Sequence, residues 1–275
     1  MGDEGEHEMT YGDAVLFGAV QGLTEFLPIS SSGHIVLLEK LLHVDVDHNT
    51  AFVLMLHVGT LMAVLYAMRK EVRWLIQHPK ARETWMLVLA LLPTAVIGGL
   101  FEEWFDDLFA SGATIGLEFL LTGIILWWMD AVDAGPKNET TMTAADSLWI
   151  GALQGAAILP ALSRSGLTIA GGLWRGLNRE AATRFSFLLS IPAILGGVLV
   201  KLDDLVEAHG SAALSSGPML AGMLAALATG YLSVRWTKAL VARARMRWFA
   251  VYAFALSAWI LFDQLIQHRF FPPLA

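Results

Sequence analysis

Six long apolar segments constrain this chain more than any other feature. They cover residues 51–68, 85–101, 114–130, 185–200, 218–234 and 248–264. Each is close to the ~17–20 residues that an α-helix needs to cross the hydrocarbon core of a bilayer. The chain is 56% hydrophobic and only 16% charged, which is too apolar for an ordinary soluble domain. The sequence therefore predicts an all-α integral membrane protein, with residues 1–275 forming one membrane domain.

Composition excludes several classes of function. The absence of cysteine removes thiol catalysis, zinc-thiolate sites and redox switching. A net charge of −7 argues against a nucleic-acid partner. The apolar composition makes membrane lipids the expected surroundings. The N-terminal segment Met1–Asp13 is acidic and lacks the positive region of a signal peptide, so we expect no cleavage there.

The loops predict an orientation in the membrane. Basic residues concentrate in the segments 69–82 and 235–247, whereas the loop at 102–113 contains four acidic residues and no Lys or Arg. By the positive-inside rule the two basic segments are cytoplasmic and the acidic loop is external. Under this arrangement Arg175 and Arg179 are cytoplasmic topology determinants.

Two further apolar stretches, about 14–38 and 147–174, are interrupted by Pro, Ser and Gly and resemble each other. Gly18-Ala-Val-Gln-Gly matches Gly151-Ala-Leu-Gln-Gly, and Ser30-Ser-Ser-Gly matches Ser163-Arg-Ser-Gly. Both pairs are 133 positions apart (151 − 18 and 163 − 30). Each half then consists of one re-entrant helical hairpin and three spans, over about 14–130 and 147–264. Because three is odd, the second half enters from the opposite side, which gives an inverted-topology repeat.

Each interrupted hairpin contains one formal charge, Glu25 in the first and Arg164 in the second. An isolated charge at membrane depth costs at least ~2.5 kcal/mol, so each must face a cavity or a partner. Two other polar residues lie in the spans. For His57 we expect a satisfied interior position, and for Glu118, near the outer end of its span, we expect contact with lipid headgroups.

The hairpins contain the elements of an anion site. Gln21 and Glu25 lie four residues apart on one helix face, and Pro28 ends that helix. The serines that follow offer an N-cap for a second helix over about 32–42, with His34 in its first turn. The second hairpin has the same break and cap, with Arg164 in the place of one of these serines. Capped helix ends, an arginine and several hydroxyls suit phosphate better than carboxylate, although close helix packing or a purely structural ion pair would also explain them.

The two hairpins resemble the undecaprenyl-diphosphate phosphatase family, also known as bacitracin-resistance proteins. The first block, from Gln21 to His34, is similar to that family's Glu/Gln-x-x-x-Glu segment running into Ser-Ser-x-Gly-His. The second, from Pro160 to Thr168, is similar to Pro-Gly-x-Ser-Arg-Ser-Gly-x-Thr. Two positions depart from the pattern. Gln21 stands where many members have Glu, and Ala161 replaces the usual Gly.

The resemblance implies hydrolysis of undecaprenyl diphosphate with a divalent cation, Mg²⁺ or Ca²⁺, on the external side of the bacterial cytoplasmic membrane. It implies a catalytic core of four residues, namely Glu25, Ser31, His34 and Arg164. It also implies a phosphate-binding shell in the same two loops, comprising Gln21, Ser30, Ser32, Gly33, Ser163, Ser165, Gly166 and Thr168. One carboxylate is few for a metal site, so Glu25, with Gln21 beside it, would share the ion with the substrate diphosphate.

The sequence leaves several alternatives open. Ser31, His34 or a water could be the nucleophile, and the chain could act as a monomer or a homodimer. Inverted repeats with broken helices are also typical of transporters, so a secondary transporter or flippase of a polyprenyl phosphate lipid is the main rival. The acid-phosphatase-like lipid phosphatases are a weaker rival, because after Arg164 no His occurs until His209.

Overall fold

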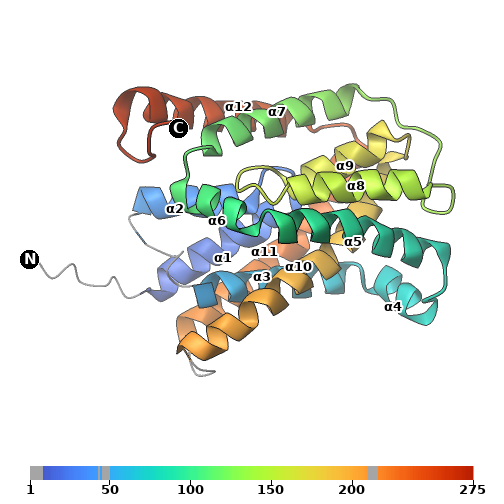
Figure 1. The fold of residues 1–275 in the computed structure, drawn as a ribbon, viewed down its shortest axis with the longest axis horizontal. Helices are drawn as coiled ribbons and strands as arrows, with labels where there is room; N and C mark the ends of the chain where they lie inside the picture. The colour runs from blue at the N-terminus through green and yellow to red at the C-terminus, as the bar shows by residue number, and fades with distance from the viewer. Residues whose placement is uncertain (1–8, 43, 45–49, 210–215, 275) are drawn as a thin grey trace, which may run out of the picture.

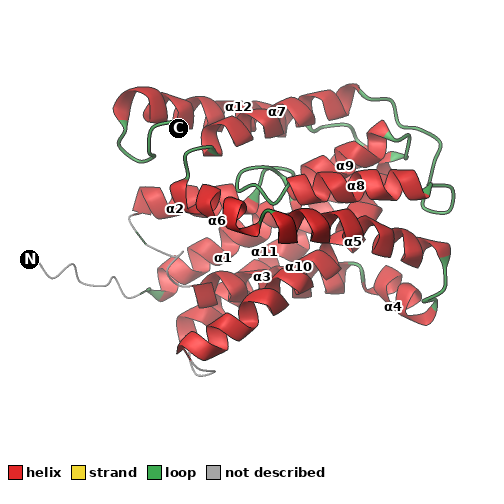
Figure 2. Ribbon diagram, in the orientation of Figure 1, coloured by secondary structure: helices red, strands yellow, loops and turns green. Residues whose placement is uncertain are grey.

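The computed structural model describes residues 9–42, 44, 50–209 and 216–274, and for residues 50, 102–103, 106, 109–110 and 202–209 it describes the backbone alone. The acidic segment 1–8, part of the N-terminus expected to escape cleavage, lies outside the described residues. Apart from one isolated β-bridge, all regular structure in the described chain is helical (Figures 1 and 2). The helices are α1 (Tyr11–Phe26), α2 (Ser31–Leu42), α3 (Thr50–Ala67), α4 (Arg69–Gln77), α5 (Arg82–Leu100), α6 (Glu102–Ser111), α7 (Ile115–Ala131), α8 (Ala144–Ala156), α9 (Arg164–Trp174), α10 (Arg179–His209), α11 (Gly217–Ala242), α12 (Arg247–Phe262) and the π-helix η2 (Asp263–Gln267).

Several of these helices are long and apolar enough to cross a membrane. Within the described chain they are Arg82–Leu100, Arg179–Lys201, Gly217–Ala242 and Arg247–Gln267. A further candidate is Ala51–Ala67 together with α4, which is bent away from it by 79°. The predicted all-helical architecture, with helices long and apolar enough to cross a membrane, is therefore confirmed. The segments predicted as loops at 69–82 and 102–113 contain the short helices α4 and α6 instead.

The two helices that open the interrupted hairpins, α1 and α8, begin in the same way. The Thr10 hydroxyl accepts a hydrogen bond from the Asp13 N–H, while the Asp13 carboxylate accepts one from the Thr10 N–H. Thr143 and Asp146 form the same reciprocal capping box on α8. Such a box satisfies two backbone donors that a helix start otherwise leaves unpaired. The two boxes are 133 positions apart (143 − 10), which is the offset of the sequence blocks.

Glycines set the close packing of these helices. α1 packs along α11, and α8 packs along α5. A Cβ atom at Gly22 would overlap Thr229 and the backbone of Ala226, and one at Gly151 would overlap the backbone of Ala90. Because lipid gives no hydrophobic drive for helix association, close backbone contact through small residues is the usual means of packing. Elsewhere α3 packs against α10 and α11, and α7 lies beside α12 at the top of Figure 1.

Both hairpins break where the sequence indicates. α1 ends at Phe26, two residues before Pro28, and α2 begins at Ser31. Ser30, between them, has a φ of 68°, a left-handed conformation that costs a non-glycine residue of order 1 kcal/mol or more. The second break runs from the end of α8 at Ala156 to Ser163, which caps α9. These breaks bring irregular backbone into the interior, so its polar groups need partners there.

The linker between α7 and α8 is fastened to the turn between α9 and α10 by Asp146. This buried carboxylate accepts hydrogen bonds from Lys137 Nζ at 2.9 Å and Arg175 Nε at 2.7 Å. Arg175, predicted only as a topology determinant, is thus one half of an ion pair. Burial by itself raises the pKa of Asp146, but hydrogen bonds from Thr143, Lys137 and Arg175 outweigh it and hold the pKa well below its ordinary value.

We therefore expect Asp146→Asn to lower the Tm, because Lys137 and Arg175 lose their anionic partner, at a cost of about 1–3 kcal/mol. A lowered pKa in the folded state gives stability that is present above the ordinary aspartate pKa of ~4 and lost only as the pH falls through the folded value. The Tm difference between wild type and variant should be constant from about pH 8 to about pH 6 and shrink in strong acid. Thermal unfolding in detergent measures it, with the exposed Asp133→Asn as control. Equal Tm values at neutral pH would contradict the role of Asp146.

Candidate active site

The two breaks meet at an ion pair between Glu25 and Arg164. Nη2 of Arg164 donates to Oε1 of Glu25 at 2.5 Å across a sequence separation of 139 residues. The Glu25 side chain is 6% exposed and that of Arg164 is 17% exposed. Each of the two solitary charges, expected to face a cavity or a partner, therefore has the other as its partner. A pair this deeply buried needs further hydrogen bonds to offset the cost of removing both charges from water.

Glu25 receives those hydrogen bonds from its own hairpin. Its Oε2 accepts from Nε2 of Gln21 at 3.0 Å, one helical turn away, and from Oγ of Ser31 at 2.5 Å. Ser31 is the first residue of α2, so the break at Pro28 turns its hydroxyl back towards the end of α1. A hydroxyl that donates to a buried carboxylate is a nucleophile with a base in contact.

One nitrogen of the Arg164 guanidinium does not donate a hydrogen bond within the described residues. Its Nη1 is buried and has no hydrogen-bond partner among the described residues. A buried guanidinium nitrogen without a partner is costly, and the arginine fork suits a phosphate oxygen. This unsatisfied donor, beside the Ser31 hydroxyl and Glu25, is the feature of the site that most directly indicates an anionic ligand.

The other predicted serines and threonine make contacts within the protein. Oγ of Ser30 donates to the carbonyl of Pro160 at 2.7 Å, and Oγ of Ser165 donates to the carbonyl of Leu27 at 3.2 Å, so each break is bonded to the other. Thr168 donates to the carbonyl of its own helix at Arg164 and contacts Ser186. For these hydroxyls to contact phosphate they would have to exchange a partner they already hold.

The two capping serines occupy equivalent places. Ser30 accepts from the N–H of Gly33 at 3.4 Å, and Ser163 accepts from the N–H of Gly166 at 3.1 Å. These glycines were predicted in the phosphate-binding shell, and in the structure their N–H groups are used in the helix caps. Ser32 is half-buried next to Ser31.

His34 lies in the first turn of α2, as predicted, but does not contact Ser31. Its Nδ1 is 2.5 Å from the carbonyl oxygen of Ser30, and its Nε2 is 2.7 Å from the hydroxyl of Tyr252. Phe119 meets the ring edge-on at a centroid distance of 5.5 Å. The serine and the histidine, both in the first turn of α2, therefore belong to separate hydrogen-bonded groups.

The expectation that Glu118 reaches the headgroups is wrong. Its side chain is buried, and its Oε2 accepts from the N–H of Ala161 at 2.5 Å while its Oε1 accepts from the hydroxyl of Thr114. The cause is the second break, which exposes a backbone N–H that needs an acceptor inside the protein. Glu118 thus fastens the tip of the second hairpin to α7.

Tyr252 was also missed by the sequence analysis. It lies in an apolar span among other aromatic residues, and nothing in its neighbourhood sets it apart from an interfacial anchor. His57 lies, as expected, inside α3 with its Nδ1 bonded to the carbonyl of Val53.

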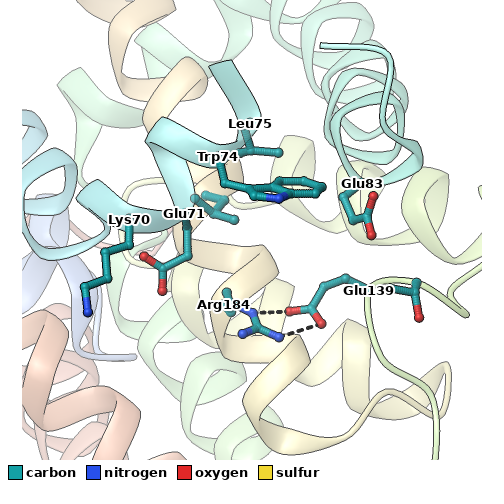
Figure 3. Close-up of a pocket in the computed structure, with 9 residues that line it drawn as sticks. Lys70, Glu71, Trp74, Leu75, Glu83, Glu139 and Arg184 are labelled. Carbon is teal, nitrogen blue, oxygen red and sulfur yellow. Dashed lines mark hydrogen bonds and ion pairs between the residues drawn. The ribbon is translucent and has the colours of Figure 1, made fainter. Parts of the chain in front are cut away.

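The pocket drawn in Figure 3 lies away from these residues. It has a volume of about 390 Å³ and is lined by side chains of α4, the start of α5, α10 and the linker before α8. Glu139 accepts two hydrogen bonds from Arg184 across it (Figure 3). No residue of either hairpin break is among those that line it, so we assign it no part in the chemistry.

The fold and the site together define a class: a helical membrane protein in which two interrupted helical hairpins bring a carboxylate, a guanidinium and a serine hydroxyl together in the interior. Comparison with known families specifies the class further. The family model described as bacitracin resistance protein BacA matches residues 14–259, and the chain belongs to this family. The family resemblance drawn from the two hairpin motifs is thereby confirmed.

Named relatives match almost the whole chain. An undecaprenyl-diphosphatase of Carboxydothermus hydrogenoformans is 43% identical over 90% of this chain and 95% of its own length. Undecaprenyl-diphosphatase 3 of Bacillus cereus is 41% identical over 93% of this chain and 98% of its own. An undecaprenyl-diphosphatase of Methanobrevibacter smithii is 37% identical over 94% and 98%, respectively.

Proposed function

We propose that this chain hydrolyses undecaprenyl diphosphate to undecaprenyl phosphate and inorganic phosphate. The names and the near-complete coverage of its relatives support this activity, as does membership of the family. The observation in the site that supports it most is the unpartnered Nη1 of Arg164 beside the Glu25–Ser31 pair. The product is the lipid carrier used in bacterial cell-wall synthesis, so the reaction recycles that carrier.

The proposed chemistry divides between the two hairpins. Phosphoryl transfer needs stabilisation of charge on the equatorial phosphate oxygens and a nucleophile in line with the leaving group. Arg164 supplies a fixed positive charge and a free donor in a low-dielectric site, where such groups act strongly. Ser31 attacks the terminal phosphorus, and Glu25, which already accepts its hydrogen bond, takes the proton. Undecaprenyl phosphate leaves, and water hydrolyses the phosphoserine.

Two other nucleophiles stay in competition with Ser31. Water held by Ser31 and Glu25 would give the same products without a covalent intermediate. His34 would have to use Nε2, because its Nδ1 is bonded to the Ser30 carbonyl, and Nε2 is in contact with Tyr252. The 2.5 Å contact of Ser31 with a carboxylate favours the serine. His34, in its protonated form, then acts through Nε2–H as a donor to one of the phosphate oxygens.

We expect Arg164→Ala and Glu25→Ala each to lower kcat about 100-fold or more, because each removes a charge used in the transition state and leaves its partner unpaired. In Ser31→Ala we expect kcat to fall by the same factor. Phosphate release from undecaprenyl diphosphate in detergent measures this, with the exposed Arg243→Ala as a matched control.

Radiolabelled phosphate that is trapped on the wild-type protein and on His34→Asn, but not on Ser31→Ala, would identify Ser31 as the nucleophile. Near-normal turnover in both Arg164→Ala and Glu25→Ala would exclude this site.

A divalent cation, Mg²⁺ or Ca²⁺, is proposed as a companion of the substrate. The described residues contain no group of three or more His, Asp or Glu side chains placed to hold a metal. Within residues 14–38 and 147–174, all of which the structure describes, Glu25 is the only carboxylate, and both of its oxygens already accept hydrogen bonds. These side chains do not form a metal cage by themselves. A cation would be bound chiefly by the diphosphate, with Glu25 and the Gln21 amide oxygen as protein ligands.

If so, a chelator should abolish turnover and either cation should restore it. Gln21→Ala should raise the cation concentration needed for half-maximal activity several-fold while changing maximal activity less, because Gln21 contacts Glu25 without contacting Arg164. The measurement is a titration of phosphate release against free Mg²⁺ or Ca²⁺. Full activity in excess chelator would remove the cation from the proposal.

For the membrane arrangement we propose six spans and two re-entrant hairpins in two inverted repeats, about 14–130 and 147–264, within one domain. The spans are α3, α5, α7, α10, α11 and α12. The identical capping boxes on α1 and α8 and the paired caps at Ser30 and Ser163 support this repeat. So does the exchange of partners between halves: α1 of one half packs on α11 of the other, and α8 packs on α5.

We further propose that α4 and the segment 235–247 are cytoplasmic and that the site opens to the external side of the bacterial cytoplasmic membrane. The chain has no cysteine, so single cysteines report topology without background. In intact cells a membrane-impermeant maleimide should label Asp107→Cys, at the acidic segment, and should label Lys70→Cys only after permeabilisation. The reverse pattern would invert the orientation.

Transport alone is not favoured, because the relatives that cover almost the whole chain are named undecaprenyl-diphosphatases. A counterflow assay with labelled undecaprenyl phosphate tests it. Exchange that survives in Arg164→Ala would support a transport cycle independent of hydrolysis.

A further inference from the structure

The contact between His34 and Tyr252 joins the first hairpin to the last span. The two residues are 218 positions apart, and their rings are stacked with centroids 5.7 Å apart and an interplanar angle of 13°. We propose that Tyr252 is a positioning residue that holds the Nε2 atom of His34 in its reactive orientation. The proposal rests on the part assigned above to His34 in binding the substrate phosphate.

The hydrogen-bond pattern fixes which nitrogen of His34 is available. The carbonyl oxygen of Ser30 has no hydrogen, so the Nδ1 atom 2.5 Å from it must be the donor. The neutral ring then has its lone pair on Nε2, and Tyr252 donates its hydroxyl proton to it. When His34 takes up a proton, Nε2–H becomes the donor and the same hydroxyl accepts, because a phenol does both. The contact therefore persists in either protonation state.

The surroundings of the ring leave Tyr252 as its outermost contact. His34 is 7% exposed and Tyr252 is 43% exposed. Phe119 of α7 closes another edge of the imidazole. Of the two ring nitrogens only Nε2 is directed out of the first hairpin, and the tyrosine hydroxyl is its partner among the described residues.

α12 is itself fixed in place, so Tyr252 is a rigid partner. Ser257 donates to the carbonyl of Gly116 at 2.7 Å, and the backbone N–H of Arg247 donates to Asp130 at 2.9 Å, which joins α12 to α7 at both ends. An apolar cluster of α2, α7 and α12 side chains lies beside this contact; it includes Val36, Leu37, Ile115, Phe119 and Ile260. A catalytic group held by a packed helix keeps its geometry better than one held by a loop.

The test is Tyr252→Phe, which keeps the stacked ring and removes only the hydroxyl. We expect kcat for phosphate release to fall about tenfold, the factor that corresponds to one hydrogen bond, with KM unchanged within about twofold. The ¹⁵N resonance of the His34 Nε2 atom, assigned by its loss in His34→Asn, should shift in Tyr252→Phe. Tyr66→Phe is the matched control, because it removes the same group from an exposed ring on α3 that packs at a tilt against Tyr231.

The outcomes separate this proposal from the one it rests on. Wild-type kcat and an unshifted Nε2 signal in Tyr252→Phe would overturn the positioning role. A lowered Tm with an unshifted signal and unchanged kcat would also overturn it, because the tyrosine would then be only structural. If His34→Asn keeps full turnover while Tyr252→Phe shifts the Nε2 signal, the contact is correct and the proposed part of His34 in catalysis fails instead.

Discussion

The ion pair between Glu25 and Arg164 is the interaction on which the site depends. In an apolar interior neither charge is tolerable alone, and removal of one partner leaves an uncompensated charge that typically costs 3–5 kcal/mol. Since one charge belongs to each interrupted hairpin, the pair also fixes the two breaks against each other. Gln21 and Ser31 complete the hydrogen bonding of the carboxylate, while Nη1 of Arg164 is left for a ligand.

The broken helices impose a second constraint, because each break releases backbone groups that water cannot satisfy at membrane depth. The protein meets it with short polar side chains: Ser30 and Ser163 cap the helices that follow, Ser30 and Ser165 bond to carbonyls of the opposite break, and Glu118 accepts the N–H of Ala161. Most of the serine hydroxyls at the two breaks therefore satisfy backbone groups. Ser31 is the exception, since its hydroxyl bonds to the carboxylate of Glu25.

Most of the fold was predictable from the sequence because its signals are local. Pro28 and the serines that follow it predict the end of α1 and the start of α2, and apolar length predicts the helices that cross the membrane. The scarcity of charge in the hairpins indicated that Glu25 and Arg164 would need each other. Glu118 was misjudged because its partner is a backbone N–H freed by a break elsewhere in the chain, and one residue's position in a span gives no information about that.

The sequence by itself determined the membrane class, the place of both breaks, the 133-residue correspondence and the residue types at the site, since these follow from apolar length, proline and glycine chemistry and spacing along one chain. Only the tertiary structure decided which hydroxyl meets the carboxylate and which nitrogen of His34 is available. It also showed that Tyr252, 218 residues away, holds that nitrogen. The reason is physical: these contacts depend on side-chain orientation, across a helix break for Ser31 and Glu25 and between elements 218 residues apart for His34 and Tyr252. Periodicity specifies a helix face but not the partner that this face meets.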